Sequence, residues 1–219
     1  MNNSDLPKRI DIGDWTFRVK VPAHMDEHTR ILLLLHGHLG NENVMWILTK
    51  TLPENLALLA PRAPIKMGVN QYSWHKIGPH WPKLDVYQAV LSQLLIQVNE
   101  WREPYHLQDH QVDVMGFSQG AVMAYAFSML YPDQVGRVAA LAGFIPNQWK
   151  ETFQNAAFNG KTFYVAHGIH DEVIPIEQAR KTVNWLRKQS AQVTFCEADI
   201  GHKLSAKCYK DLGNFFRKY

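Results

Sequence analysis

The stretch VDVMGFSQGAVMAYAFSML, residues 112–130, joins a β-branched run to a long apolar run through a serine between two glycines. Val112 to Met115 has the composition of a strand, and Gln119 to Leu130 has that of a helix. This order places Ser118 on a sharp turn, where side chains at positions 116 and 120 would collide with neighbouring segments. We therefore expect Ser118 to be exposed at the carboxyl edge of a sheet.

On both sides of this stretch, short apolar runs alternate with longer runs, most of them of helical period. The expected strands are Trp15 to Val21, Ile31 to Leu35, Leu56 to Ala60, Val112 to Met115, Arg137 to Ala142, Thr162 to Ala166 and Gln192 to Cys196. The expected helices are Glu42 to Thr51, Leu84 to Trp101, Gln119 to Leu130, Ile176 to Lys188 and Ser205 to Arg217. Several strands are apolar on both sides, as in a parallel sheet between two helix layers. The sequence predicts a doubly wound α/β fold.

The whole chain is expected to form a single domain. It has 219 residues, of which 46% are hydrophobic, and it contains no repeat, low-complexity tract or flexible linker. A chain of this length and composition can bury one continuous core. The segment Pro61 to Lys83 interrupts the alternation with four prolines and three aromatic residues. Such a long loop is either functional or a packed surface loop.

Charge and cysteine content indicate the class of protein and its location. The formal charge is +3, and the basic residues occur singly or in pairs rather than as a stripe. This pattern predicts no nucleic-acid partner. The start of the chain has no apolar signal region, and Ile31 to Leu35 is too short for a transmembrane segment. Cys196 and Cys208 are too far apart for a CxxC motif, so we expect free thiols and a cytoplasmic protein.

A serine hydroxyl becomes a useful nucleophile only when a base and an orienting acid lie beside it. Asp171 follows the expected strand Thr162 to Ala166, and His202 follows the expected strand Gln192 to Cys196. The chain order of Ser118, Asp171 and His202 is that of α/β-hydrolases. We therefore predict these three residues as the catalytic triad. Other carboxylates near these turns are Glu172, Glu197 and Asp199.

Acyl transfer also requires backbone N–H groups that stabilise a developing oxyanion. The residue after the nucleophile, Gln119, is expected to supply one of them. The second should come from the loop after Ile31 to Leu35, with the amide of His38 as first choice and that of Leu39 as second. We expect the substrate pocket to be lined by Leu39, Trp74, Ile77 and Trp81.

The sequence resembles the phospholipase/carboxylesterase family, which includes bacterial carboxylesterases and acyl-protein thioesterases. The matching stretches span most of the chain and are Leu35 to Gly37, Ala60 to Pro64, Gly116 to Met123, Ala142 to Pro146, His167 to Pro175 and Gly201-His202. The resemblance implies an α/β-hydrolase fold and the same triad and oxyanion residues, and no large lid domain is expected. One departure is Ser73-Trp74-His75-Lys76, where family members commonly have Trp-Phe-Asp or Trp-Tyr-Asp.

The predicted activity is that of a serine carboxylesterase, which hydrolyses a small-molecule ester through an acyl-enzyme without metal or cofactor. A thioesterase or lysophospholipase would use the same triad on long acyl chains. A metallohydrolase built on His36-Gly37-His38, with Asp171 or His170, would need a fuller ligand set than this motif provides. A non-catalytic binding protein on the same scaffold is the remaining alternative. The sequence indicates no particular oligomeric state.

Overall fold

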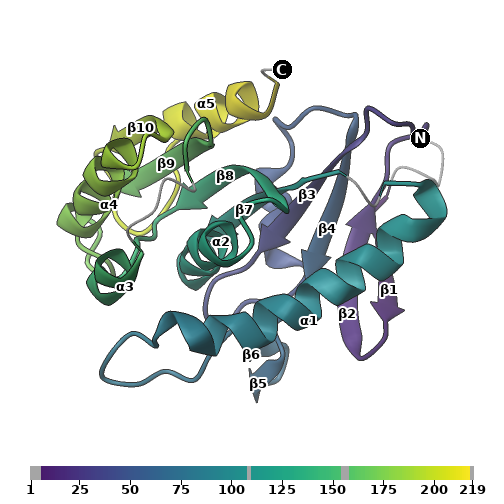
Figure 1. Ribbon diagram of the computed structural model, residues 1–219, viewed down its shortest axis with the longest axis horizontal. Coiled ribbons are helices and arrows are strands. Elements are labelled where there is room, and N and C mark those ends of the chain that lie inside the picture. The colour runs from purple at the N-terminus through teal and green to yellow at the C-terminus, as the bar shows by residue number, and fades with distance from the viewer. Residues whose placement is uncertain (1–5, 108–109, 154–157, 218–219) are drawn as a thin grey trace.

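The fold is built on one eight-stranded sheet, seen in a computed structural model that describes residues 6–107, 110–153 and 158–217 (Figure 1). The strand order is β1-β2-β4-β3-β7-β8-β9-β10. Strand β2 pairs antiparallel with β1 and β4, and all the other pairs are parallel. The strands are β1 Lys8–Ile12, β2 Trp15–Lys20, β3 Arg30–Leu35, β4 Leu56–Pro61, β7 Val112–Phe117, β8 Val135–Leu141, β9 Thr162–Gly168 and β10 Gln192–Ala198.

Helices cover both faces of this sheet, as predicted. Helices α1, α2 and α4 pack on one face, and α5 packs on the other (Figure 1). The helices are α1 Leu84–Arg102, α2 Gln119–Leu130, α3 Asn147–Thr152, α4 Ile176–Lys188 and α5 Ala206–Arg217. The residues that the structure describes include no large lid domain, and the mostly parallel sheet between helices confirms the predicted doubly wound α/β architecture. No helix in the described ranges has the length and apolar character needed to cross a bilayer.

The burial of β3 shows why its sequence is aliphatic throughout. Ile31, Leu33 and Leu35 belong to the core under α1 and α2, whereas Leu32 and Leu34 belong to the core under α5. All five side chains are fully buried. Because successive residues of a strand point to opposite faces, a strand covered on both sides needs apolar residues at every position.

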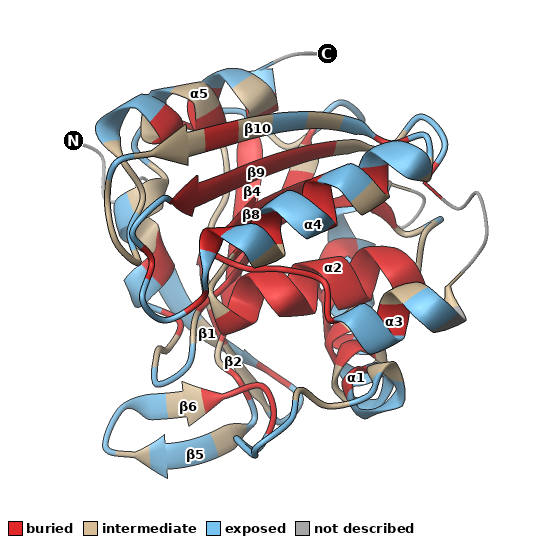
Figure 2. Ribbon diagram, turned by 90° about the vertical axis from the view of Figure 1, so that its left-hand side faces the viewer, coloured by how far each residue is buried: buried red, intermediate tan, exposed pale blue. Residues whose placement is uncertain are grey.

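Several segments differ from the sequence-based expectation. The predicted helix Glu42 to Thr51 is a short 3₁₀ helix, Val44–Leu48, because its run of apolar residues has no polar face to direct toward solvent. The segment 61–83 contains a hairpin of β5 Ile65–Gly68 and β6 Gln71–Ser73, which lies at the edge of the molecule and is largely exposed (Figure 2). Strand β1 was also not predicted, because its alternation rests on Ile10 and Ile12 alone.

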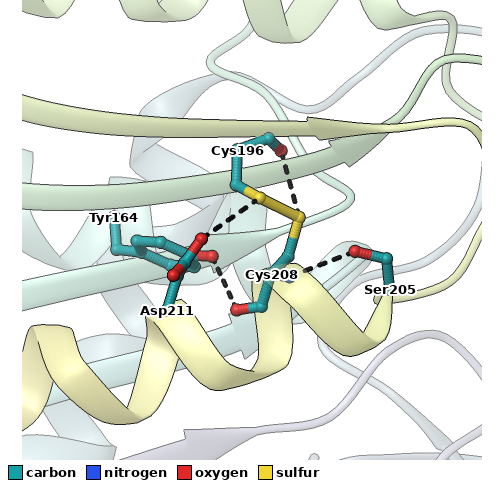
Figure 3. Close-up of a disulfide and its surroundings, with 5 residues drawn as sticks. All are labelled: Tyr164, Cys196, Ser205, Cys208 and Asp211. Atoms are coloured by element: carbon teal, nitrogen blue, oxygen red, sulfur yellow. Dashed lines mark hydrogen bonds between the residues drawn. A yellow bond between two sulfur atoms is a disulfide. The ribbon is translucent and has the colours of Figure 1, made fainter.

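The expectation of two free thiols is wrong, because Cys196 and Cys208 form a disulfide (Figure 3). Their Cα atoms lie 5.7 Å apart, although twelve positions separate them in the sequence. The chain leaves β10, turns back and enters α5, so the first turn of that helix lies against the strand end. A disulfide of this kind stabilises a fold by about 2–4 kcal/mol, mainly by restricting the unfolded chain. Here it closes the loop that carries His202.

Candidate active site

Ser118 lies on a sharp turn between β7 and α2, in the unusual backbone conformation φ +52°, ψ −117°. Its N–H donates to the carbonyl of Leu141, 2.8 Å away in the next strand. A Cβ at position 116 would lie 2.0 Å from the oxygen of Gly120, and one at position 120 would lie 2.0 Å from the oxygen of Leu35. Only glycine tolerates such close backbone approach. The turn therefore holds the serine at the carboxyl edge of the sheet.

The loops after β9 and β10 bring the predicted acid and base together. The N–H of Ile169 donates to the carbonyl of Ala198 at 2.8 Å, which ties one loop to the other. At this junction His202 Nδ1 lies 2.7 Å from Asp171 Oδ2. Since a carboxylate only accepts, the imidazole carries its proton on Nδ1 and leaves Nε2 free to act as a base.

The carboxylate of Asp171 is buried and fully satisfied. Its Oδ1 accepts hydrogen bonds from the N–H groups of Val173 at 2.9 Å and Ile174 at 2.8 Å. The side chain is fully buried, so these donors replace the water that the charge has lost. Because both backbone donors approach Oδ1, the other oxygen is directed toward His202. The carboxylate is thus fixed in one orientation.

The other carboxylates considered for the acid role are engaged elsewhere or exposed. Glu197 forms a two-point ion pair with Arg180, at 2.7 and 2.9 Å. Asp199 is exposed and lies 2.5 Å from His170. Glu172, which directly follows Asp171, is exposed. Asp171 is therefore the carboxylate that contacts His202.

Ser118 and His202 line the same cavity, which has a volume of about 830 Å³. Much of its wall comes from the 3₁₀ helix and from the start of α5, two segments on the side of the sheet opposite to α1. The apolar lining residues are Leu39, Val44, Met45, Ile47, Leu48, Phe117, Leu204, Ala206 and Tyr209. Apart from Leu39, sequence reasoning missed these walls. The signal available in the sequence was the uninterrupted apolar run 44–48. In the structure, Ile47 of this run is 71% exposed.

Three residues expected in the pocket do not line this cavity. Trp74 is buried, with 1% of its surface exposed, and its Nε1 donates to the carbonyl of His36 at 2.7 Å. Trp81 packs edge-on against Phe144, with ring centroids 5.1 Å apart. Ile77 is exposed on the surface. The aromatic loop therefore supports the site from outside this cavity.

The loop after β3 is held in place by the side chain of His36. Its Nε2 accepts from the N–H of Ala63 at 3.0 Å, so Nδ1 carries the proton and donates to the carbonyl of Gly37 at 2.7 Å. Burial lowers the pKa of His36 to about 4, so the ring is neutral near pH 7. The carbonyl of His36 also accepts the hydrogen bond from Trp74. Through these contacts His36 fixes the segment that leads to His38 and Leu39. Both of these residues line the cavity.

Gln119 is buried, and its side chain links the turn at Ser118 to the aromatic loop. Its Oε1 accepts from the N–H of Trp74 at 3.0 Å, and its Nε2 donates to Ser73 Oγ at 3.0 Å. Ser73 Oγ also lies 3.2 Å from His38 Nδ1. Gln119 is the first residue of α2, and the first N–H groups of a helix have no partner within it. The loop after β3 and the turn at Ser118, which are expected to supply the two oxyanion donors, are therefore connected through Ser73.

The histidines considered as metal ligands are arranged for other contacts. Both ring nitrogens of His36 are hydrogen bonded to the backbone, as described above, which leaves neither available to a metal. Across residues 6–107, 110–153 and 158–217, no three His, Cys, Asp or Glu side chains are grouped so that they could hold a metal ion.

Comparisons with known proteins agree with this architecture. A model of the phospholipase/carboxylesterase family matches residues 18–219. Acyl-protein thioesterase 1 of Candida albicans is 24% identical over 75% of this chain and 80% of its own. A probable inactive carboxylesterase of Oryza sativa is 27% identical over 80% of this chain and 79% of its own. The Bacillus cereus carboxylesterase structure superposes with a TM-score of 0.80 at 18% identity, covering 93% of this chain and 94% of its own. The chain therefore belongs to the phospholipase/carboxylesterase family of α/β-hydrolases.

Proposed function

We propose that the chain is a serine esterase in which Ser118 is the nucleophile, His202 the base and Asp171 the orienting acid. The observation that carries the proposal is the hydrogen bond of 2.7 Å between His202 and Asp171, beside a cavity that His202 shares with Ser118. The serine also has the strained backbone of a nucleophile elbow. A small-molecule carboxylic ester is the proposed substrate, and the whole chain is proposed to act as one domain.

In the first half of the reaction, Ser118 Oγ attacks the ester carbonyl and its proton passes to His202 Nε2. The tetrahedral intermediate then collapses, the bond to the alcohol oxygen breaks, and Nε2 returns the proton to the departing alcohol. In the second half, water attacks the acyl-enzyme and gives a proton to Nε2. When the second intermediate collapses, its bond to Ser118 Oγ breaks, Nε2 returns the proton to Oγ, and the carboxylic acid is released. Throughout, Asp171 stabilises the imidazolium that forms.

The developing oxyanion is proposed to accept hydrogen bonds from the backbone amides of Gln119 and His38, with Leu39 as the alternative for the second donor. Backbone donors that are fixed before the reaction stabilise the charge without reorganisation. The side-chain bonds of His36 and Gln119 described above support this proposal because they hold both segments rigidly. The acyl chain is proposed to contact Leu39 and the other apolar residues of the cavity.

Labelling with a fluorophosphonate tests the proposed nucleophile. We expect one phosphonyl group per chain, mapped by mass spectrometry to the peptide that contains Ser118, and loss of p-nitrophenyl butyrate hydrolysis in proportion to labelling. Excess chelator should leave the activity unchanged. Activity that survives full labelling, or that disappears with chelator, would contradict the proposal. A chain with neither labelling nor turnover would instead be a binding protein on this scaffold.

The apolar cavity favours a second candidate, an esterase or thioesterase for longer acyl chains. Each buried methylene contributes about 0.8 kcal/mol, or about a fourfold gain in kcat/KM if it is buried in the transition state. We expect kcat/KM to rise by about this factor per methylene from p-nitrophenyl acetate toward the octanoate.

Two matched variants show whether this cavity causes the trend. Ile47→Asp places a charge in the cavity wall and should flatten the dependence on chain length. Ile96→Asp makes the same change at an exposed position of α1, which does not line the cavity, and should leave the dependence intact. A preference for acetate in the unaltered protein would contradict the longer-chain reading.

A cytoplasmic location stays a proposal, and the disulfide weighs against it. Cytosolic reductants keep most thiols reduced, whereas disulfides persist in oxidising compartments. The bond between Cys196 and Cys208 therefore removes the support that the cysteines were expected to give to a cytoplasmic location.

A further inference from the structure

His167 is a buried histidine for which the mechanism above has no role. It lies near the end of β9, four residues before Asp171, and its side chain is fully buried. A buried imidazole is costly unless its polar atoms are satisfied, so its contacts should reveal what it does.

The ring of His167 contacts the acid loop at two points. Its Nε2 lies 2.7 Å from the carbonyl oxygen of Ile174, at the far end of that loop. The same nitrogen lies 3.2 Å from Asp171 Oδ2, the oxygen that also binds His202 Nδ1. Its Nδ1 is buried and has no hydrogen-bond partner among the residues that the structure describes. All the polar contacts of the ring are therefore made through Nε2.

These contacts determine the protonation of His167. A carbonyl oxygen can only accept, so Nε2 must carry a proton and donate it to Ile174. Burial lowers the pKa of His167 below its ordinary value, so the ring is neutral near pH 7 and Nδ1 carries only a lone pair. The residue is thus a neutral donor with its single N–H fixed between a carbonyl and a carboxylate oxygen.

We propose that His167 is a positioning residue for the catalytic acid, an inference that rests on the proposed esterase function. Its N–H holds the end of the acid loop through Ile174, and the two N–H groups that bind Asp171 Oδ1 come from that same loop end. The N–H of His167 carries a partial positive charge and lies beside Asp171 Oδ2. It therefore favours the carboxylate orientation in which Oδ2 binds His202. His167 thus acts on the base through the acid and touches neither substrate nor nucleophile.

Three variants separate the N–H from the bulk of the ring. The amide nitrogen of Gln reaches about as far as Nε2, Met fills a similar volume without a donor, and the amide of Asn reaches only as far as Nδ1. His167→Gln should keep kcat within about threefold of the wild type, whereas His167→Met and His167→Asn should lower it by about 10- to 100-fold. KM should change by less than about twofold in all three, because the residue does not contact substrate.

The His202 Nδ1 proton provides a readout that does not depend on turnover. We expect its low-field ¹H NMR signal to stay in place in the Gln variant and to shift or broaden in the Met and Asn variants. Wild-type kcat and signal in a folded Met or Asn variant would overturn the inference, as would an equal loss of kcat in the Gln and Met variants. If Met or Asn does not fold, the other still supplies a variant that has no donor at the position of Nε2. If Ser118 is not the nucleophile, phosphonate labelling fails while the NMR comparison still tests the positioning role.

Discussion

Ser118→Ala is expected to lower kcat for p-nitrophenyl butyrate by about 10⁴-fold or more, with little change in KM. The substitution removes the oxygen that forms the acyl-enzyme and leaves the cavity and the oxyanion donors in place. The remaining activity should come from substrate binding and oxyanion stabilisation alone. Steady-state kinetics measure the effect, and mass spectrometry should detect no acyl-enzyme in the variant.

A matched substitution tests whether the loss is specific to this hydroxyl. Ser128 is a buried serine of α2, the helix that follows Ser118, and its hydroxyl donates to the carbonyl of Tyr125 at 2.9 Å. Ser128→Ala should keep kcat within about twofold, because it removes a local bond far from the reacting atoms. If Ser118→Ala retained wild-type turnover, or if Ser128→Ala lost as much as Ser118→Ala, the assignment of the nucleophile would fail.

Asp171→Asn is expected to lower kcat by about 10⁴-fold through the tautomer of His202. Because Oδ1 accepts two backbone N–H groups, an asparagine should keep its oxygen there and turn its NH₂ toward His202 Nδ1. That nitrogen must then accept, which moves the imidazole proton to Nε2. An imidazole in this form cannot take the serine proton. Stopped-flow measurement of acylation should locate the defect in the first chemical step.

Asp199→Asn is the control for this substitution. Asp199 belongs to the same loop as His202, but it is exposed and pairs with His170 on the surface. The kcat of the Asp199→Asn variant should stay within about twofold of the wild type, since exposed ion pairs contribute little to stability. Equal losses in the two variants would show that a general change in charge, rather than the orientation of the imidazole, causes the effect.

Most of the fold could be predicted because strands that are buried on both faces of the sheet have apolar residues at nearly every position. Strands β3 and β7 are of this kind, and α2 follows β7 directly. The hairpin β5–β6 could not be predicted in the same way, because it is largely exposed and its short strands have no regular apolar pattern. The cysteine pairing was missed because it depends on a chain reversal that brings α5 against β10.

The sequence predicts the residues of the candidate site that directly follow a strand. It does not predict which residues line the cavity. Asp171 and His202 follow β9 and β10, and parallel strands end at one edge of a sheet. Trp74 was expected in the pocket because it lies in an aromatic loop, but its Nε1 is directed to a backbone carbonyl in the core. Which aromatic side chain faces a cavity depends on packing between distant segments, and the local sequence does not encode it.

The proposed role of Ser118 sets a requirement of catalysis against the stability of the fold at one residue. A non-glycine side chain held in a sparsely populated backbone conformation costs about 1–3 kcal/mol, and folded proteins are typically stable by only about 5–15 kcal/mol. This cost is present in every folded molecule, with or without substrate. A lineage that no longer needed the reaction would gain stability from glycine at this position. With Ser118 as the proposed nucleophile, the reaction favours serine at this position, whereas the stability of the fold favours glycine.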